Sequence, residues 1–206
     1  MSDYKDYGYD NNLRPIHFNY LEPGLMKWLS IAKNKTILDI GCGNGYFVNE
    51  LIAKGYKAYG IDASEKGIEQ ARKTNPDAFF VMDVSSNELP SLLRSIKFDM
   101  IICTEVIEHL YDPVAFIKFC RSILSPGGEI MISTPYHGYL KNLMLSLFNK
   151  WDGHISPLWL GGHIKMWSRS TVTRLLNENG FSVKGFKGCG RISYLWMSML
   201  IKATAK

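Results

Sequence analysis

The chain has 206 residues, of which 46% are hydrophobic and 13% aromatic, enough for one well-packed α/β domain but too few for two. No apolar run approaches the ~18 residues of a membrane span, and the polar start lacks the apolar core of a signal peptide, which argues against a membrane-spanning or exported protein. The net charge of +5 is concentrated from residue 163 onward, where eight Lys or Arg accompany Glu178 alone. This part is either a solvated basic face or a surface that attracts an anionic acceptor or membrane headgroups, so a peripheral membrane contact stays open.

Short apolar segments bounded by turn residues alternate with helical patterns along the chain, which is typical of a parallel sheet with crossover helices. Strands are expected at residues 36–40, 57–61, 79–82, 98–103 and 129–133. Helices are expected between them, with Ser64 and Asp112 as N-caps, Pro113 at the first helical position and Gly55 at the end of the first helix. A last helix should end at Gly180, followed by an antiparallel hairpin, although the run 196–201 could also be helical.

The predicted fold class is therefore α/β, a Rossmann-like doubly wound sheet of seven strands, mostly parallel with an antiparallel C-terminal hairpin strand. One domain over residues 1–206 should contain an N-terminal helical lid (1–34), a cofactor-binding core (35–134), an inserted acceptor lid (135–163) and a C-terminal helix and hairpin (164–206). The insertion combines an apolar helix with a loop rich in Trp, Pro and Gly, which favours a lid or an acceptor pocket. Alternatively, Leu143, Leu147 and Trp151 simply cover the sheet.

The stretch "ILDIGCGNGYF" places three glycines, Gly41, Gly43 and Gly45, directly after a strand and before a helix. Glycine admits positive φ and lets a ligand approach the backbone, so such a turn is a common nucleotide cradle. The third glycine comes one residue earlier than in the dinucleotide fingerprint. Acidic residues stand before the turn and at the ends of the next two strands, namely Asp39, Asp62 and Asp83. Each acid alone could cap a helix or begin a turn, but together they indicate a ligand site.

Residues 36–135 resemble the class I S-adenosylmethionine-dependent methyltransferases, in particular the ubiquinone-biosynthesis O-methyltransferases and the methyltransferase type 11 and 12 group. The resemblance rests on "ILDIGCGNGYF", "AYGIDASEKGIEQAR", "FFVMDV", "FDMIICTEVIEHL" and "LSPGGEIMISTP", in the family's order and spacing. It implies S-adenosylmethionine as cofactor and S-adenosylhomocysteine as product. It also implies that Asp39 helps to hold the amino end, that Asp62 binds the ribose hydroxyls and that Asp83 receives the adenine amino group. The expected cofactor-binding residues are Asp39, Gly41, Cys42, Gly43, Asn44, Gly45, Asp62, Ala63, Asp83, Val84 and Glu105.

The segment "TEVIEHL" is the candidate for the acceptor side. Methylation of a hydroxyl requires removal of a proton by a base, or a metal, near the end of the fourth strand. Glu105, Glu108 and His109 have the spacing that brings side chains to one face if the segment is helical. Similar segments with a later histidine, here His163, occur in the ubiquinone O-methyltransferases and in small-RNA 2′-O-methyltransferases, which hold a divalent metal. We predict these four residues as the acceptor side, with His163 as acid or base and no metal; a metal site is the alternative.

Other histidines and tyrosines are weaker candidates: Tyr136 and His137 on the acceptor face, and His17 and Tyr20 in the N-terminal lid, whereas no role is predicted for His154. The predicted function is methyl transfer from S-adenosylmethionine, as O-methylation of a small-molecule acceptor. Nucleic acid is disfavoured because the insertion is apolar rather than basic. A nicotinamide-dependent oxidoreductase and a non-catalytic cofactor-binding scaffold are the alternatives. Four scattered cysteines without metal spacing fit the cytoplasm, and nothing specifies an oligomeric state.

Overall fold

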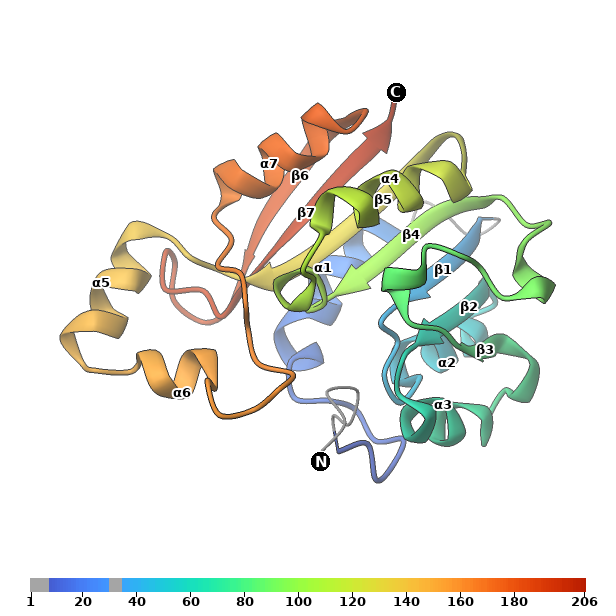
Figure 1. The fold of residues 1–206 in the computed structure, drawn as a ribbon, viewed down its shortest axis with the longest axis horizontal. Helices are drawn as coiled ribbons and strands as arrows, with labels where there is room; N and C mark the ends of the chain where they lie inside the picture. The colour runs from blue at the N-terminus through green and yellow to red at the C-terminus, as the bar shows by residue number, and fades with distance from the viewer. Residues whose placement is uncertain (1–7, 30–34) are drawn as a thin grey trace.

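The computed structural model describes residues 8–29 and 35–206, and its centre is a seven-stranded sheet with the order β3-β2-β1-β4-β5-β7-β6 (Figure 1). The strands are β1 (Thr36–Ile40), β2 (Lys57–Asp62), β3 (Phe79–Val81), β4 (Phe98–Thr104), β5 (Leu124–Pro135), β6 (Phe181–Cys189) and β7 (Ser198–Ala205). Strands β1 to β5 are parallel, and β7 runs antiparallel between β5 and β6. The predicted fold class is confirmed. Residues 1–7 and 30–34 of the expected N-terminal lid lie outside the described residues.

Helices cover both faces of the sheet. The helices α1 (Phe18–Leu29), α2 (Tyr46–Ala53) and α3 (Glu65–Arg72) pack into one buried apolar cluster, whereas α4 (Pro113–Ile123) and α7 (Arg169–Glu178) pack into the other. Four short 3₁₀ turns complete the layers, η1 (Pro76–Ala78), η2 (Val84–Ser86), η3 (Ser91–Leu93) and η4 (Ile107–His109). The central strands are buried on both sides. Because β1, β2 and β4 are parallel neighbours, their carboxyl ends lie at a common edge of the sheet.

The helix starts follow the predicted caps. The Ser64 hydroxyl accepts a hydrogen bond from Gly67 N, and the Asp112 carboxylate accepts one from Ala115 N with Pro113 at the first helical position. A side-chain oxygen at the N-cap satisfies a backbone donor that has no partner within the helix. These local interactions fix where α3 and α4 begin.

The C-terminal run 196–201 is extended rather than helical from Ser198 onward. Within β7, Ile201 pairs with Ile132 on one side and with Phe186 on the other. A strand with two partners satisfies its backbone groups on both edges, which decides between two conformations that the apolar pattern alone permits. The predicted hairpin is confirmed, and β7 also joins the hairpin to the rest of the sheet.

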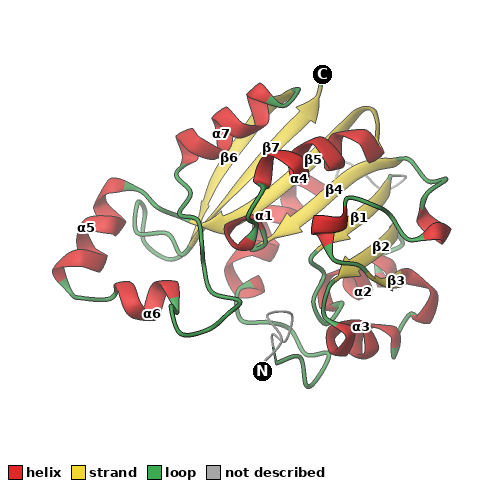
Figure 2. Cartoon of the chain, in the orientation of Figure 1, coloured by secondary structure: helices red, strands yellow, loops and turns green. Residues whose placement is uncertain are grey.

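The insertion forms α5 (Tyr139–Leu147) and α6 (Trp151–Ile155), which extend away from the sheet (Figure 2). Leu143 is 44% exposed and Leu147 is 67% exposed, so the interpretation that these side chains cover the sheet is wrong. Lys141 is the buried residue of α5, and α6 has none. Among the described helices, none combines the length and the hydrophobicity that crossing a bilayer requires.

Candidate functional site

A cavity of about 520 Å³ lies at the carboxyl ends of β1, β2 and β4. The loop 159–164 and the N-terminal segment, through Tyr9, Pro15, His17 and Phe18, complete its walls. Most of the residues predicted to bind the cofactor line it: Asp39, Gly41, Cys42, Gly43, Asn44, Asp62, Ala63, Asp83, Val84 and Glu105. The remaining one, Gly45, is not among the lining residues.

The three glycines of the turn all have positive φ, but they serve different contacts. A Cβ on Gly45 would overlap Ala71 Cβ on α3, so this glycine allows the turn to pack against the helix. A Cβ on Gly43 would lie 2.7 Å from the hydroxyl of Tyr9, which reaches over the turn from the N-terminal segment. Gly43 therefore faces the cavity side, whereas Gly45 faces the protein interior.

The acids at the ends of β2 and β3 combine structural contacts with positions on the cavity wall. The Asp62 carboxylate accepts hydrogen bonds from Gly43 N and Ser64 N, each at 2.8 Å. Asp83 accepts from the backbone nitrogen and the hydroxyl of Ser85 and begins the η2 turn. Each carboxylate keeps lone pairs for a ligand, so the cap and the predicted ligand role are compatible.

Asp39 has a buried carboxylate oxygen that lacks a protein partner. The side chain is 1% exposed, and Oδ1 has no hydrogen-bond partner among the described residues. Burial, and then the negative charge of Asp62, raise the pKa of Asp39 to about 8. A buried acceptor without a donor costs stability, so a ligand amino group delivered at this point would be bound favourably.

Asn44 has a side-chain role that its motif did not indicate. Its amide nitrogen donates to Asn11 O at 3.0 Å and to Leu13 O at 2.8 Å, which fastens the N-terminal segment beside the cavity. Tyr9 and Pro15 on this segment are cavity residues that the sequence interpretation missed, because no pattern near the polar N-terminus marks them. The helix α1 itself packs against the sheet, through side chains such as Leu25.

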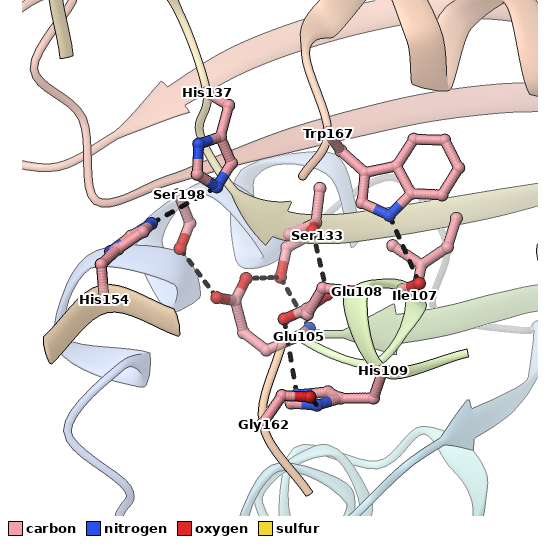
Figure 3. Close-up of polar contacts among 11 residues, drawn as sticks. Glu105, Ile107, Glu108, His109, Ser133, His137, His154, Gly162, Trp167 and Ser198 are labelled. Carbon is pink, nitrogen blue, oxygen red and sulfur yellow. Dashed lines mark hydrogen bonds and ion pairs between the residues drawn. The ribbon is translucent and has the colours of Figure 1, made fainter. Parts of the chain in front are cut away.

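Glu105 is not part of the group that the other predicted acceptor residues form, Glu108, His109 and His163. Residues 104–109 do not form an α-helix: Glu105 has a φ of 54°, and the 3₁₀ turn η4 follows. The Glu105 carboxylate accepts hydrogen bonds from Ser133 Oγ at 2.6 Å and from Ser198 Oγ at 2.9 Å (Figure 3). Burial raises the pKa of this carboxyl to about 7. The spacing predicted one common face, but the left-handed residue turns Glu105 toward β5 and β7.

Glu108, His109 and His163 do come together, with side-chain donor atoms within 4.8 Å of one another. Glu108 is 1% exposed; Oε2 accepts from Thr134 Oγ1 at 2.9 Å, and Oε1 has no hydrogen-bond partner in the described part of the chain. Burial, and then the charge of Glu105, hold the pKa of Glu108 well above its usual range, which favours the protonated carboxyl. These three groups could hold a cation only if Glu108 ionised.

The two histidines of this group are neutral imidazoles. Their rings lie 5.0 Å apart between centroids, and His109 Nδ1 lies 3.3 Å from Gly162 O. Burial lowers the pKa of His109, and burial followed by the neighbouring histidines lowers that of His163 to about 4. Both rings line the cavity, so a proton acceptor is available there at neutral pH.

The other predicted histidine and tyrosine positions are not on the cavity wall, apart from His17. His137 contacts Asn142 and His154, and Tyr136 lies edge-on to Trp196. The residues on the acceptor side that the sequence interpretation missed are Trp159 and Leu160. Their only signal in the sequence was the composition of the inserted loop.

Comparison with known proteins places this geometry in a family context. A family model described as a methyltransferase domain matches residues 16–184. The ubiquinone biosynthesis O-methyltransferase of Marinobacter nauticus is 26% identical over 171 residues, which cover 75% of this chain and 70% of the relative. The crystal structure of magnesium protoporphyrin IX methyltransferase from Synechocystis, with bound S-adenosylhomocysteine, superposes with a TM-score of 0.69 at 20% identity and covers 96% of this chain and 91% of its own. An S-adenosylmethionine-dependent methyltransferase from Mesorhizobium loti gives 0.70 at 21% identity, with 89% and 97% covered.

Proposed function

The chain belongs to the methyltransferase domain family and uses S-adenosylmethionine, and from that premise we propose that it methylates a hydroxyl group of a small, partly apolar acceptor. The observation that carries the proposal is the pair of neutral imidazoles, His109 and His163, on the cavity wall, with the buried carboxyl of Glu108 beside them. A neutral amine attacks through its own lone pair, and a thiolate has already lost its proton, so neither needs a proton acceptor for the attack. A hydroxyl, in contrast, must lose its proton as the new bond forms. The alternative of a nicotinamide-dependent oxidoreductase does not agree with the family match.

The residues at the glycine turn fit the cofactor. The buried Oδ1 of Asp39 lacks a donor, which the cofactor's ammonium group would supply. Gly43 presents backbone without a side chain on the cavity side, and Asp62 and Asp83 offer carboxylate oxygens to hydroxyl and amino donors. When bound, S-adenosylmethionine supplies an activated methyl group and a good leaving group. We therefore propose Asp39, Gly43, Asp62 and Asp83 as its main contacts.

The acceptor side supports an uncharged, partly apolar molecule. Trp159, Leu160 and Ile164 line the cavity next to His109 and His163. Among the described lining residues there is no lysine or arginine that would pair with an anion. We propose that the loop 159–164 forms the acceptor wall, which keeps water from the reacting atoms.

The role of His163 in this reaction is proton acceptance. Because its pKa is lowered to about 4, the imidazole is unprotonated across the neutral range and can accept a proton. Bound S-adenosylmethionine would supply the methyl group and leave as S-adenosylhomocysteine, and the hydroxyl proton would pass to His163, which lies beside Glu108. His109, held by Gly162 O, positions the loop against η4.

Transfer of radiolabelled methyl from S-adenosylmethionine to matched phenol, aniline and thiophenol acceptors tests the proposal. We expect turnover with the hydroxyl compound, and a fall of about 10²–10⁴-fold in kcat for His163→Gln with unchanged cofactor affinity. Methylation of the amine alone would overturn the hydroxyl specificity. Tight cofactor binding without turnover on any acceptor would favour the non-catalytic scaffold instead.

We also propose that the insertion makes a peripheral contact with an anionic membrane surface. Apolar side chains are exposed on α5 and in the loops before and after α6, among them Tyr139 at 86%, Phe148 at 63% and Leu158, which is fully exposed. The exposed Lys150 lies between α5 and α6. Apolar residues flanked by lysine and arginine suit a bilayer with anionic headgroups.

Sedimentation with vesicles that contain anionic phosphatidylglycerol checks this contact. Leu158→Asp should reduce the bound fraction, whereas Leu92→Asp, at a residue 73% exposed on the η3 turn, should not. Equal binding by wild type and Leu158→Asp would exclude the insertion as the contact.

A further inference from the structure

The helix α6 is placed against the rest of the protein by polar contacts rather than by a buried apolar face. None of its residues is buried, and the side chains of α5 beside it are also largely exposed. Two imidazoles join α6 to the end of the sheet: His154 Nε2 lies 3.3 Å from His137 Nε2 (Figure 3). The Trp151 ring stacks parallel to the His137 ring at 6.1 Å between centroids.

His137 is a fixed point for this contact. It lies two residues after the end of β5, its side chain is buried, and its backbone nitrogen donates to Trp167 O. Its Nδ1 lies 3.1 Å from Asn142 Oδ1. With the amide oxygen as acceptor, Nδ1 carries the hydrogen and the Nε2 lone pair faces His154. His154 then donates its Nε2 hydrogen to His137.

The position of His163 follows from that of α6. The His163 backbone nitrogen donates to Ile155 O at 3.2 Å, which ties His163 to the last residue of α6. The rings of His154 and His163 lie 6.0 Å apart between centroids. Any movement of α6 away from His137 would therefore carry His163 away from His109 and from the cavity.

We propose that the His137–His154 pair is a positioning pair for His163: the hydrogen bond between the two imidazoles holds α6 so that the His163 ring faces the acceptor side of the cavity. The inference rests on the proposed function for its catalytic consequence, but the placement itself does not depend on it. Neither histidine of the pair lines the cavity. They act on the reaction through His163 and not by contact with the acceptor.

The charged and titratable groups around His163 come from several elements: Glu108 and His109 at η4, His137 after β5, Lys141 on α5 and His154 on α6. Burial among these groups lowers the pKa of His163 to about 4. Loss of the placement would expose the ring to water, so its pKa would return toward about 6.5. The pKa of His163 thus reports its position without any acceptor or turnover.

The experiment compares His154→Phe, which keeps a ring but removes the donor, with His154→Gln, whose amide can donate to His137 Nε2. The His163 resonance is assigned from its loss in His163→Gln, and its pKa is read by NMR titration of the intact cofactor-bound protein. We expect the pKa to rise by about one unit or more in His154→Phe and in His137→Phe, and to stay near the wild-type value in His154→Gln. Asp152→Ala, an exposed change on α6, is the matched control.

Activity of the same variants separates this inference from the proposed function. We expect kcat to fall about tenfold or more in His154→Phe and His137→Phe, no further in the double variant, with cofactor affinity unchanged and with recovery in His154→Gln. An unchanged His163 pKa in both Phe variants would overturn the positioning role. A raised pKa with unchanged kcat would support the placement and would instead refute His163 as the acceptor base.

Discussion

The Asp62 carboxylate accepts a hydrogen bond of 2.8 Å from Gly43 N, which joins the end of β2 to the middle of the glycine turn. Its other oxygen accepts from Ser64 N at the start of α3, so one side chain fixes the turn and the next helix relative to each other. Burial raises the pKa of Asp62, whereas the two backbone donors act in the opposite direction. A residue in this position can arrange the cofactor site and also contact the ligand.

Replacement of Asp62 should weaken cofactor binding without unfolding the protein. Asp62→Ala removes a charged acceptor, and each hydrogen bond to a charged group is worth roughly 1.5–3 kcal/mol. We expect a loss of roughly 3–6 kcal/mol in binding free energy by calorimetry, from two such bonds. Asp77→Ala, at an exposed acid on η1, serves as the control. Equal dissociation constants for Asp62→Ala and wild type would refute the ribose role.

Gly45 should tolerate substitution less well than another glycine with the same sign of φ. Gly45→Ala places a Cβ against Ala71 and within 2.8 Å of Phe79 Cε1, whereas Gly55→Ala meets no atom within 4 Å. Both variants carry the cost of a left-handed alanine, about 1–2 kcal/mol. Overpacking should add about 1–3 kcal/mol for Gly45→Ala alone. Urea unfolding of the two variants should show this difference in the free energy of unfolding. Equal losses of stability would mean that the turn can shift away from α3 without cost.

Asp39 should make the stability of the cofactor-free protein fall as the pH rises. Its pKa is about 8 in the folded state against 3.8 in the reference state, so the folded protein binds the extra proton between these values. Stability from the protonated form is therefore present at low pH and is lost as the pH rises through this window. The free energy of unfolding of Asp39→Asn should depend less on pH than that of wild type. Relative to wild type, the variant should therefore be more stable at pH 8 than it is at pH 5. Urea unfolding that gives the same stability difference between variant and wild type at the two pH values would contradict the raised pKa.

Glu108 should accept an amide in place of its carboxyl. Because burial and the charge of Glu105 hold its pKa well above the usual range, the protonated carboxyl is favoured, and Glu108→Gln keeps the shape and lack of charge of that form. We expect Glu108→Gln to fold with a stability within about 1 kcal/mol of wild type, whereas Glu108→Ala leaves a cavity and loses about 2 kcal/mol or more.

Chelator treatment and the Glu108→Gln variant together distinguish a proton acceptor from a metal site on the acceptor side. If no metal takes part, chelator should leave methyl transfer unchanged, and Glu108→Gln should lose less activity than His163→Gln. A metal held by Glu108, His109 and His163 would instead make the reaction sensitive to chelator and would make Glu108→Gln inactive. Activity measured after dialysis against chelator, with manganese added back, distinguishes the two.

The amino-acid sequence determined the elements whose signals are local. The caps at Ser64 and Asp112 are side chains that bind backbone donors three residues later, so composition and spacing are sufficient to place α3 and α4. Buried parallel strands leave short apolar runs, which is why β1 was predicted at the residues where it lies. The glycine turn and the acids after the strands were predicted together because the ends of parallel strands converge at one edge.

The tertiary structure decided what depends on contacts between distant segments. The side chain of Asn44 binds the N-terminal segment about thirty residues earlier, and no spacing rule predicts such a partner. Glu105 left the expected group because its left-handed backbone and two serines on β5 and β7 direct its carboxylate elsewhere. His154, for which no role was predicted, meets His137 only because the insertion folds back on the end of β5. Hydrogen bonds of this kind require geometry at the scale of an ångström, which periodicity and composition do not encode, whereas strand, cap and glycine signals depend on the chain within a few residues.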